Sequence, residues 1–216
     1  MLKKILILTF MLLFVSGCEK VEIEDSIRWV TIADIEKSLE SQPPMNIGFD
    51  VDDTVLFSSA GFHYGQRKYS PGSSEFMQSE AFWEEMNNDL DKFSMPKECA
   101  ERLIEIHKKR GDTIYFITAR PATKTETLTD YLADIFALEN PNKVIFTGFK
   151  RGENFKIEPI KKLNIQIFYG DSDTDIEAAQ ASGKRAIRII RAENTKYKPL
   201  PEYGALGEEV LVDSGY

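Results

Sequence analysis

Asn-Ile-Gly-Phe-Asp-Val-Asp-Asp-Thr, at residues 46–54, is the most informative stretch of this 216-residue chain. Its apolar start is followed by Asp50 and Asp52, which lie two residues apart. Side chains two apart in an extended chain point to the same side, and neither carboxylate could be buried there alone without a large cost. We therefore predict a buried strand whose end carries acidic groups that bind a cation or take part in a reaction.

A second acidic cluster follows a second strand-like run. Residues 165–169 have strand character, and Gly-Asp-Ser-Asp-Thr-Asp follows at 170–175. Ligands of open parallel sheets bind beyond the carboxyl ends of the strands, so we expect both clusters at one crevice. Carboxylate oxygens suit Mg²⁺, and His63 and His107 are too few for a histidine-rich zinc site. Together the clusters predict a magnesium and phosphate site.

The rest of the chain alternates between strand-like and helix-like segments. Thr31 and Asp34 form a capping-box pattern that predicts a first helix. We expect strands at 46–51, 113–118, 143–147, 166–170 and 186–190, helices at 96–110, 123–136, 157–163 and 173–182, and a possible edge strand at 210–212. This alternation predicts an α/β fold with three layers, in which helices cover both faces of a parallel sheet.

The segment between the first acidic motif and residue 94 is too long for a simple crossover and is rich in aromatic residues. We predict a small cap at about residues 54–94, inserted after the first strand and lying over the site. Phe62 and Tyr64 are the expected substrate contacts, because they are the rings nearest to the acids in sequence. For most of the rings, packing in the core of the cap or against another subunit is an equally good explanation.

The acidic pair at 50 and 52 suits phosphoryl transfer. Asp50 would attack phosphorus and form an aspartyl-phosphate, while Asp52 would protonate the leaving oxygen and then deprotonate water. Magnesium would bind carboxyl oxygens of Asp50 and Asp171 and the backbone carbonyl of Asp52.

The transferred phosphoryl group also needs hydrogen-bond donors and positive charge. Thr118, Ala119 and Arg120 follow the expected strand at 113–118 and offer a hydroxyl, backbone N–H groups and a guanidinium. Lys156 offers an ammonium just before a helix, and Asp175 lies one helical turn beyond Asp171, where it could orient Lys156 or a metal-bound water. These residues are the expected phosphate-binding and supporting groups.

Four motifs in this order resemble the haloacid dehalogenase (HAD)-type phosphohydrolases: residues 50–54, 117–120, Lys156 and 170–175. Residues 49–59, 168–173 and 197–201 further resemble bacterial class B acid phosphatases. The resemblance implies a Rossmann-like HAD fold, one Mg²⁺ per subunit, a homotetramer, and hydrolysis of many phosphomonoesters at acidic pH, nucleotides among them, with possible transfer to an alcohol.

On matching positions the resemblance implies a role for each residue. Asp50 is the nucleophile, Asp52 the proton donor, and Asp50, Asp52 and Asp171 the metal ligands. Thr118, Ala119 and Lys156 bind the phosphate. One departure is Ala119, where the family usually has glycine, because the added methyl group could tighten or shift the phosphate pocket.

The N-terminus predicts an export signal. Lys3 and Lys4 precede an apolar run at 5–15, and Val-Ser-Gly-Cys at 15–18 resembles the lipoprotein cleavage box. We expect a signal at 1–17, a lipid on Cys18, a tether at 18–30, and a single domain at 31–216 located in the periplasm or cell envelope. An ordinary cleaved secretory signal with an incidental cysteine is the alternative. Because class C includes membrane-anchored acid phosphatases, a lipoprotein signal also leaves class C as an alternative to class B.

Charge and the remaining motifs narrow the function. Removal of residues 1–17 would leave 25 basic against 35 acidic residues, which disfavours binding to a nucleic-acid polymer. Arg-Gly-Asp at 110–112 is best explained as a helix end, and residues 191–216 predict a packed arm without recognisable chemistry.

The competing functions are a phosphotransferase, a phosphatase of narrower specificity and a non-catalytic binding lipoprotein. A binding lipoprotein would be expected to lack the nucleophile or Lys156.

Overall fold

The computed structural model describes residues 27–216. The expected signal, Cys18 and the first part of the tether lie outside the described residues. Residues 28–30, which we had placed in the tether, instead form strand β1 (Arg28–Val30) of the main sheet. Within residues 27–216, no helix combines the length and the apolar character that a membrane span requires.

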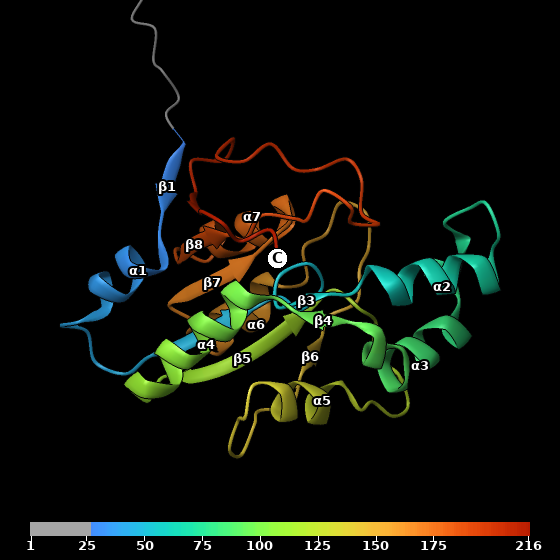
Figure 1. The fold of residues 1–216 in the computed structure, drawn as a ribbon, viewed down its shortest axis with the longest axis horizontal. Helices are drawn as coiled ribbons and strands as arrows, with labels where there is room; N and C mark the ends of the chain where they lie inside the picture. Colours follow the sequence, from blue (N-terminus) through green and yellow to red (C-terminus); the bar gives the residue numbers. More distant parts are fainter. Residues whose placement is uncertain (1–26) are drawn as a thin grey trace, which may run out of the picture.

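A parallel sheet of seven strands forms the centre of the molecule (Figure 1). Every strand pair in it is parallel, in the order β1-β9-β8-β7-β2-β5-β6. The remaining strands are β2 (Asn46–Phe49), β5 (Thr113–Thr118), β6 (Ile145–Phe146), β7 (Ile167–Gly170), β8 (Arg185–Arg188) and β9 (Glu209–Leu211). The five predicted strands are confirmed. The possible strand at 210–212 is present as β9, but its predicted position at the edge is wrong, because β1 pairs with β9 and covers it.

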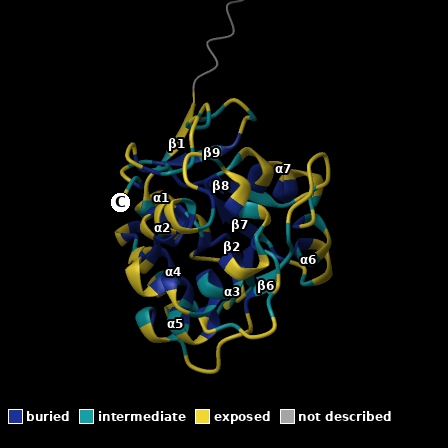
Figure 2. Cartoon of the chain, turned by 90° about the vertical axis from the view of Figure 1, so that its right-hand side faces the viewer, coloured by how far each residue is buried: buried dark blue, intermediate teal, exposed yellow. Residues whose placement is uncertain are grey.

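Helices cover both faces of the sheet. Figure 2 shows the buried strands between α4 and α5 on one side and α6 and α7 on the other. Alternation along β7 explains the two cores, because Ile167 and Tyr169 pack toward one face and Phe168 toward the other. The helices are α1 (Ile32–Leu39), α4 (Glu98–Arg110), α5 (Leu128–Ile135), α6 (Ile157–Lys162) and α7 (Asp173–Ala181). The predicted three-layer α/β fold is therefore confirmed.

The helix ends follow the local sequence signals. The capping box at Thr31 and Asp34 is formed as predicted, and Gly111 ends α4 with a φ of 76°, in the left-handed region that glycine adopts without strain. The helix expected from residue 123 begins only at Leu128. The polar residues before it bind the cap instead, since the Asn88 side chain donates to the Thr125 carbonyl and the Thr127 N–H donates to the Asn87 carbonyl.

The segment between β2 and α4 forms a helical cap at one end of the sheet (Figure 1). It contains β3 (Leu56–Phe57), α2 (Ser59–Tyr69), η1 (Glu75–Gln78), α3 (Glu80–Asn88), η2 (Leu90–Phe93) and β4 (Met95–Pro96). Antiparallel pairing of β3 with β4 closes its base. Most of its large apolar side chains pack on one another to form a separate core: Phe62, Phe76, Phe82, Trp83, Met86 and Leu90.

Candidate active site

A cavity of about 890 Å³ lies between the cap and the carboxyl ends of the parallel strands. The ends of β2, β5 and β7 contribute Asp50, Thr118 and Asp171 to its lining. Lys156 lines it from the start of α6, and Trp83 lines it from the cap. The two acidic clusters therefore meet at one crevice, as their positions after parallel strands predicted.

Asp50 is buried, and its carboxylate lies against Lys156 and Thr54. Its Oδ1 accepts a hydrogen bond from Lys156 Nζ at 2.5 Å, and the same ammonium donates to Asp175 Oδ1 at 2.6 Å. Burial raises the pKa of Asp50 well above its ordinary value, with Lys156 acting in the opposite direction. Although burial lowers the pKa of Lys156, Asp175 and Asp50 hold it above its ordinary value. Lys156 is therefore a fixed cation beside the Asp50 carboxylate.

Gly170 allows this close approach. A Cβ atom built on Gly170 would lie 2.2 Å from Cβ of Asp175, so any side chain there would push α7 away from the strand end. Asp175 completes the capping box of α7 with Ser172, whose hydroxyl donates to Asp175 Oδ2 at 2.6 Å. Both oxygens of Asp175 are thus used by Lys156 and by the helix cap, which suits Asp175 to orienting Lys156.

The oxygens around Thr54 fit a small hard cation. Thr54 Oγ1 lies 3.1 Å from Asp50 Oδ2 and 3.1 Å from Asp171 Oδ1. A hydroxyl carries one proton and can donate to only one of them. One oxygen from each of Asp50, Asp171 and Asp175 lies within 4.8 Å of the others. Buried carboxylates this close need a balancing charge, and an oxygen-only donor set matches the preference of Mg²⁺.

Asp52 is held by Arg120 and Ser58. Arg120 donates through Nε to Oδ2 at 2.9 Å and through Nη2 to Oδ1 at 2.7 Å, and Ser58 Oγ donates to Oδ1 at 2.5 Å. Burial raises the pKa of Asp52, but Arg120 and Ser58 outweigh it and hold the pKa below its ordinary value. The proton-transfer candidate is thus fixed in one rotamer beside the cavity.

Arg120, expected to bind the substrate, lines the cavity but directs its donors to protein side chains. Arg120 is 2% exposed, and it also donates to both oxygens of Asp91, a residue of the cap, at 2.7 and 2.8 Å. A weaker bond to Asn87 Oδ1 at 3.5 Å uses the fifth N–H of the guanidinium. Arg120 therefore ties the cap to Asp52 and keeps no donor for a phosphate. Nothing in the sequence around Asp91 signals this pairing.

Thr118 and Ala119 lie where the sequence placed them, at the end of β5 and in the cavity lining. The loop is braced by β6, because the Thr147 N–H donates to the Thr118 carbonyl at 2.9 Å and the Gly148 N–H to the Arg120 carbonyl at 3.0 Å. Ala119 is exposed to the cavity and is not among the described residues with positive φ. Its backbone does not require glycine, so the methyl group affects only the space inside the pocket.

The cap contacts expected at Phe62 and Tyr64 are not in the cavity lining. Helical periodicity turns Phe62 into the cap core, where it is 1% exposed and packs edge-on against Tyr197 with ring centroids 4.9 Å apart. Tyr64 points outward, is 42% exposed, and its hydroxyl lies 3.4 Å from Glu85. Instead the aromatic side chains of the lining are Trp83, Tyr197 and Phe149.

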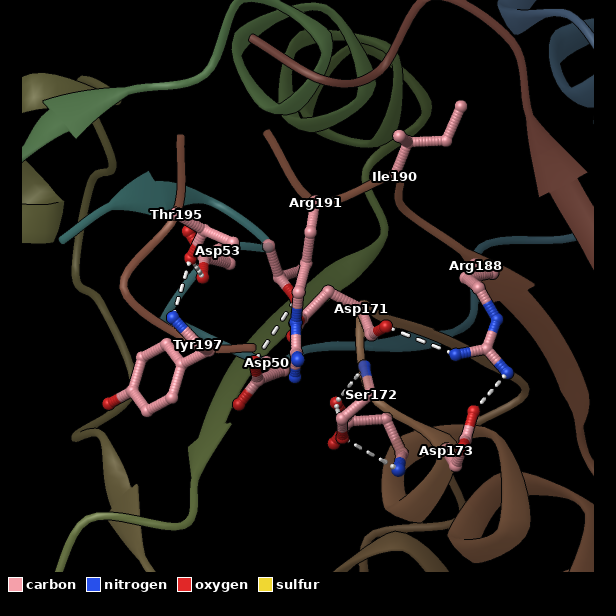
Figure 3. A network of polar contacts seen from close by, with 12 residues as sticks. Asp50, Asp53, Asp171, Ser172, Asp173, Arg188, Ile190, Arg191, Thr195 and Tyr197 are labelled. Carbon is pink, nitrogen blue, oxygen red and sulfur yellow. Dashed lines mark hydrogen bonds and ion pairs between the residues drawn. The ribbon is translucent and has the colours of Figure 1, made fainter. Parts of the chain in front are cut away.

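Residues after β8 form a part of the site that sequence analysis missed. We refer to residues 189–197 as the connector. Figure 3 shows Arg191 pointing from it toward Asp171 and Asp50, with Tyr197 beside it. Arg191 Nε donates to Asp171 Oδ2, and Thr195 Oγ1 donates to Asp53 Oδ2.

Asp53, which accepts the hydrogen bond from Thr195, lies in the loop after β2. Asp53 has a φ of 58°, in the left-handed region, where the chain turns toward the cap. Burial, followed by the nearby Asp171, raises the pKa of Asp53 to about 6. Residues 191–216, in which we had recognised no chemistry, therefore contribute Arg191 and Tyr197 to the cavity lining, although Tyr197 begins one of the motifs that carried the family resemblance.

Comparisons with known proteins give the family of the chain. The sequence model of the HAD superfamily, subfamily IIIB (acid phosphatase), matches residues 17–200. A class B acid phosphatase of Salmonella arizonae is 57% identical over 192 residues, which cover 88% of this chain and 81% of the relative. A class B acid phosphatase of Xenorhabdus bovienii is 50% identical over 205 residues, which cover 93% of this chain and 86% of the relative.

Solved structures share the fold at much lower identity. A putative phosphatase from Clostridium difficile superposes with a TM-score of 0.55 at 17% identity, covering 79% of this chain and 94% of that one. Phosphoserine phosphatase in its apo form gives a TM-score of 0.52 at 15% identity, covering 80% of this chain and 95% of that one. These similarities show that the chain has the HAD fold.

Proposed function

Because the chain belongs to the class B acid phosphatases of the HAD superfamily, subfamily IIIB, and is an acid phosphatase, we propose that it hydrolyses phosphomonoesters through a phosphorylated Asp50 with Mg²⁺ as cofactor. The observation that carries this proposal is the meeting of Asp50, Lys156 and Asp171 in one cavity, with Asp52 beside them. This arrangement combines a nucleophile, a fixed cation, a cation site and a proton donor.

In the first step, a carboxylate oxygen of Asp50 forms a bond to phosphorus while the bond between phosphorus and the leaving oxygen breaks. Asp52, protonated at acidic pH, gives its proton to that oxygen. Lys156 and the donors at Thr118 and Ala119 bind the phosphoryl oxygens and offset their charge as they approach Asp50. The products of this step are the free alcohol and an aspartyl-phosphate at Asp50.

In the second step, the Asp52 carboxylate takes a proton from a water molecule whose oxygen attacks phosphorus. The bond between phosphorus and Asp50 breaks, and Asp50 and inorganic phosphate are released. An alcohol in place of this water would give phosphotransfer, and the cavity of about 890 Å³ has room for such an acceptor. Mg²⁺ held by Asp50, Asp171 and the Asp52 carbonyl would supply positive charge that balances the carboxylates and the phosphate.

The lining of the cavity supports substrates with planar apolar leaving groups, such as nucleoside monophosphates. Trp83 lines the cavity from the cap and Tyr197 from the connector, and Phe149, which is 73% exposed, lines it from the loop after β6. Aromatic faces stabilise stacked planar groups. A binding lipoprotein without turnover is disfavoured because Asp50, Asp52 and Lys156 are all present and in contact with their partners.

We also propose the features that the sequence alone supports: export by residues 1–17, lipid attachment at Cys18, location in the periplasm or cell envelope, and assembly into a homotetramer. Mass spectrometry of the mature N-terminus tests the first two, and light scattering of the purified protein tests the last. An unmodified Cys18 would favour the ordinary secretory signal.

The proposed reaction is tested by release of phosphate from p-nitrophenyl phosphate and from a nucleoside monophosphate at acidic pH. The protein is assayed with Mg²⁺, with EDTA, and as the Asp50→Asn variant. We expect hydrolysis that needs both the metal and Asp50. Hydrolysis that survives either EDTA or Asp50→Asn would contradict the proposed mechanism, and no hydrolysis of either substrate would favour a narrow specificity.

A further inference from the structure

Asp171 is held by different partners at its two carboxylate oxygens. Oδ1 faces Thr54 Oγ1 at 3.1 Å, and that hydroxyl lies at the same distance from Asp50 Oδ2. Oδ2 accepts a hydrogen bond from Arg191 Nε. Asp171 is 3% exposed, so water has little access to either oxygen. Arg191 therefore fixes the rotation of this carboxylate and turns Oδ1 toward Asp50.

The backbone that carries Arg191 is itself anchored at the preceding residue. Lys97, which is 1% exposed, donates from Nζ to the Ile190 carbonyl at 2.7 Å and to the Asp53 carbonyl at 2.9 Å. The Ile190 N–H donates to Ser214 Oγ at 2.9 Å. The Lys97 bonds join the connector to the loop that follows β2, and the Ser214 bond joins it to the C-terminal residues. Arg191 thus projects from a base that is held to the same loop as the acidic motif.

The guanidinium of Arg191 is also placed by the wall of the cavity. Its central carbon lies 5.7 Å from the centre of the Tyr197 ring, a cation–π distance. Arg191 lines the cavity, and no hydrogen bond among residues 27–216 uses its two terminal nitrogens. The guanidinium is therefore held by the Nε hydrogen bond to Asp171 on one side and by the Tyr197 ring on the other, and both contacts lie at the site.

We propose that Arg191 is a positioning residue that sets the affinity of the metal site by orienting Asp171. The inference rests on the proposed function only in requiring a divalent cation at Asp50 and Asp171. Partners that orient metal-binding carboxylates commonly change metal affinity by about 10- to 100-fold when they are removed. Arg191 holds no proton or reacting atom in this role.

Arg191 has two opposite effects on the affinity for a divalent cation, so a measurement of that affinity tests the proposal. As a positive charge near the site, Arg191 repels a divalent cation, so its removal would strengthen metal binding. As an orienting donor, it holds Oδ1 toward Asp50, so its removal would weaken metal binding. The direction of the change therefore separates a bystander charge from a positioning residue.

The experiment is calorimetric titration of Mg²⁺ into the full chain without substrate, for the wild type, Arg191→Met and Arg191→Lys. We expect Arg191→Met to bind Mg²⁺ about 10-fold more weakly or worse. Arg191→Lys should also bind more weakly, because an ammonium keeps the charge but not the fixed Nε geometry. The activity of Arg191→Met should return toward that of the wild type at saturating Mg²⁺.

Arg185→Met is the matched control, because Arg185 is an arginine of β8 that pairs with Glu209 rather than with the site. Its metal affinity should equal that of the wild type, and thermal unfolding of each variant checks that it is folded. Equal or tighter Mg²⁺ binding by folded Arg191→Met would overturn the inference while leaving the proposed function intact. A wild type that binds no divalent cation would remove the proposed metal site and the inference together.

Discussion

At the scale of single residues, the site is governed by how each buried charge is partnered. Asp50 shares Lys156 with Asp175, whereas Asp52 has Arg120 and Ser58. The two carboxylates therefore have pKa values displaced in opposite directions, upward for Asp50 and downward for Asp52, chiefly through burial in the first case and through paired donors in the second. As a proton donor, Asp52 therefore needs acidic pH to gain its proton against Arg120 and Ser58, whereas the positive charge of Lys156 favours the ionised form that Asp50 needs as a nucleophile.

The first prediction concerns Ser58, which donates to Asp52. Ser58→Ala removes one hydrogen bond to the carboxylate, so the pKa of Asp52 should rise toward its ordinary value. If Asp52 must be protonated to serve the leaving oxygen, the high-pH limb of kcat/KM should move upward by about one unit or less. The measurement is the pH profile for an alkyl phosphate, whose poor leaving group needs that proton.

Ser59→Ala is the control for this shift. Its hydroxyl accepts from the Lys196 N–H at 2.7 Å and makes no hydrogen bond with Asp52. The limb should stay in place for Ser59→Ala. A downward shift for Ser58→Ala, or equal shifts for both variants, would contradict the role assigned to Asp52.

The second prediction concerns Phe149. Phe149→Ala should raise KM for aryl and nucleoside phosphates by roughly 2- to 12-fold, the effect of about 0.5–1.5 kcal/mol of aromatic contact, and should leave KM for small alkyl phosphates unchanged. Phe155→Ala is the control, since Phe155 is 38% exposed but does not line the cavity. Equal changes in KM for aryl and alkyl substrates would show that Phe149 does not select the leaving group.

Residues differ in how far their positions could be predicted. Asp50, Asp52, Thr118, Lys156 and Asp171 stand at strand ends or helix starts, so the chain pattern alone brings them together. Asp91, the second partner of Arg120, comes from the cap, and Arg191 comes from the connector, and the placement of both segments depends on tertiary packing.

At the scale of elements, α2 and α3 of the cap approach unusually closely at Gly65. A Cβ atom there would lie 2.2 Å from a carbon of the Phe82 ring. The third prediction is that Gly65→Ala overpacks this contact and lowers the free energy of unfolding by about 1–3 kcal/mol. Denaturant unfolding measures this change. The exposed Arg67→Ala on the same helix is the control, and a Gly65→Ala variant as stable as it would contradict the packing argument.

Helix α4 carries a buried histidine that links it to the sheet. His107 lies 2.7 Å from Asp112 through Nδ1 and 3.0 Å from the Tyr169 hydroxyl through Nε2. Burial lowers the pKa of His107, against the opposing effect of Asp112. The folded protein therefore favours neutral His107, which stabilises the fold at pH values above the ordinary histidine pKa of about 6.5 and loses this contribution as the pH falls.

The fourth prediction follows from this loss of stability as the pH falls. His107→Gln removes the titrating group and both ring contacts, so it should be less stable than the wild type at pH 7. The difference in unfolding midpoint between the two proteins should shrink between pH 7 and pH 5, because the wild type then loses its histidine contribution. Thermal unfolding across this range measures the difference, and a constant or growing gap would refute the assignment.

Elements were predictable where local signals agree with packing. Strand β5 has the bounds expected from its apolar pattern, and the capping box of α1 is formed. The late start of α5 was not predictable, because the polar residues before it bind Asn87 and Asn88 of the cap. The inner position of β9 likewise depends on β1, a strand of three residues that has no strong pattern of its own.

At the scale of the whole molecule, the site lies where three parts of the chain meet: the sheet ends, the cap and the connector. Arg120 joins the cap to Asp52, and Lys97 joins the connector to the loop after β2. The whole chain carries a net charge of −8 at pH 7, and the buried carboxylates of Asp50, Asp171 and Asp175 cluster here. A cation at this point would relieve repulsion that the fold itself creates.

The central claim is that Asp50 becomes phosphorylated during turnover. The most direct measurement is mass spectrometry of peptides from protein quenched in acid while it hydrolyses p-nitrophenyl phosphate with Mg²⁺. We expect one phosphoryl group on the peptide that contains Asp50, and none in Asp50→Asn or in protein treated with EDTA. A phosphoryl group on another residue, or active protein whose Asp50 peptide stays unmodified under conditions that accumulate the intermediate, would contradict the account.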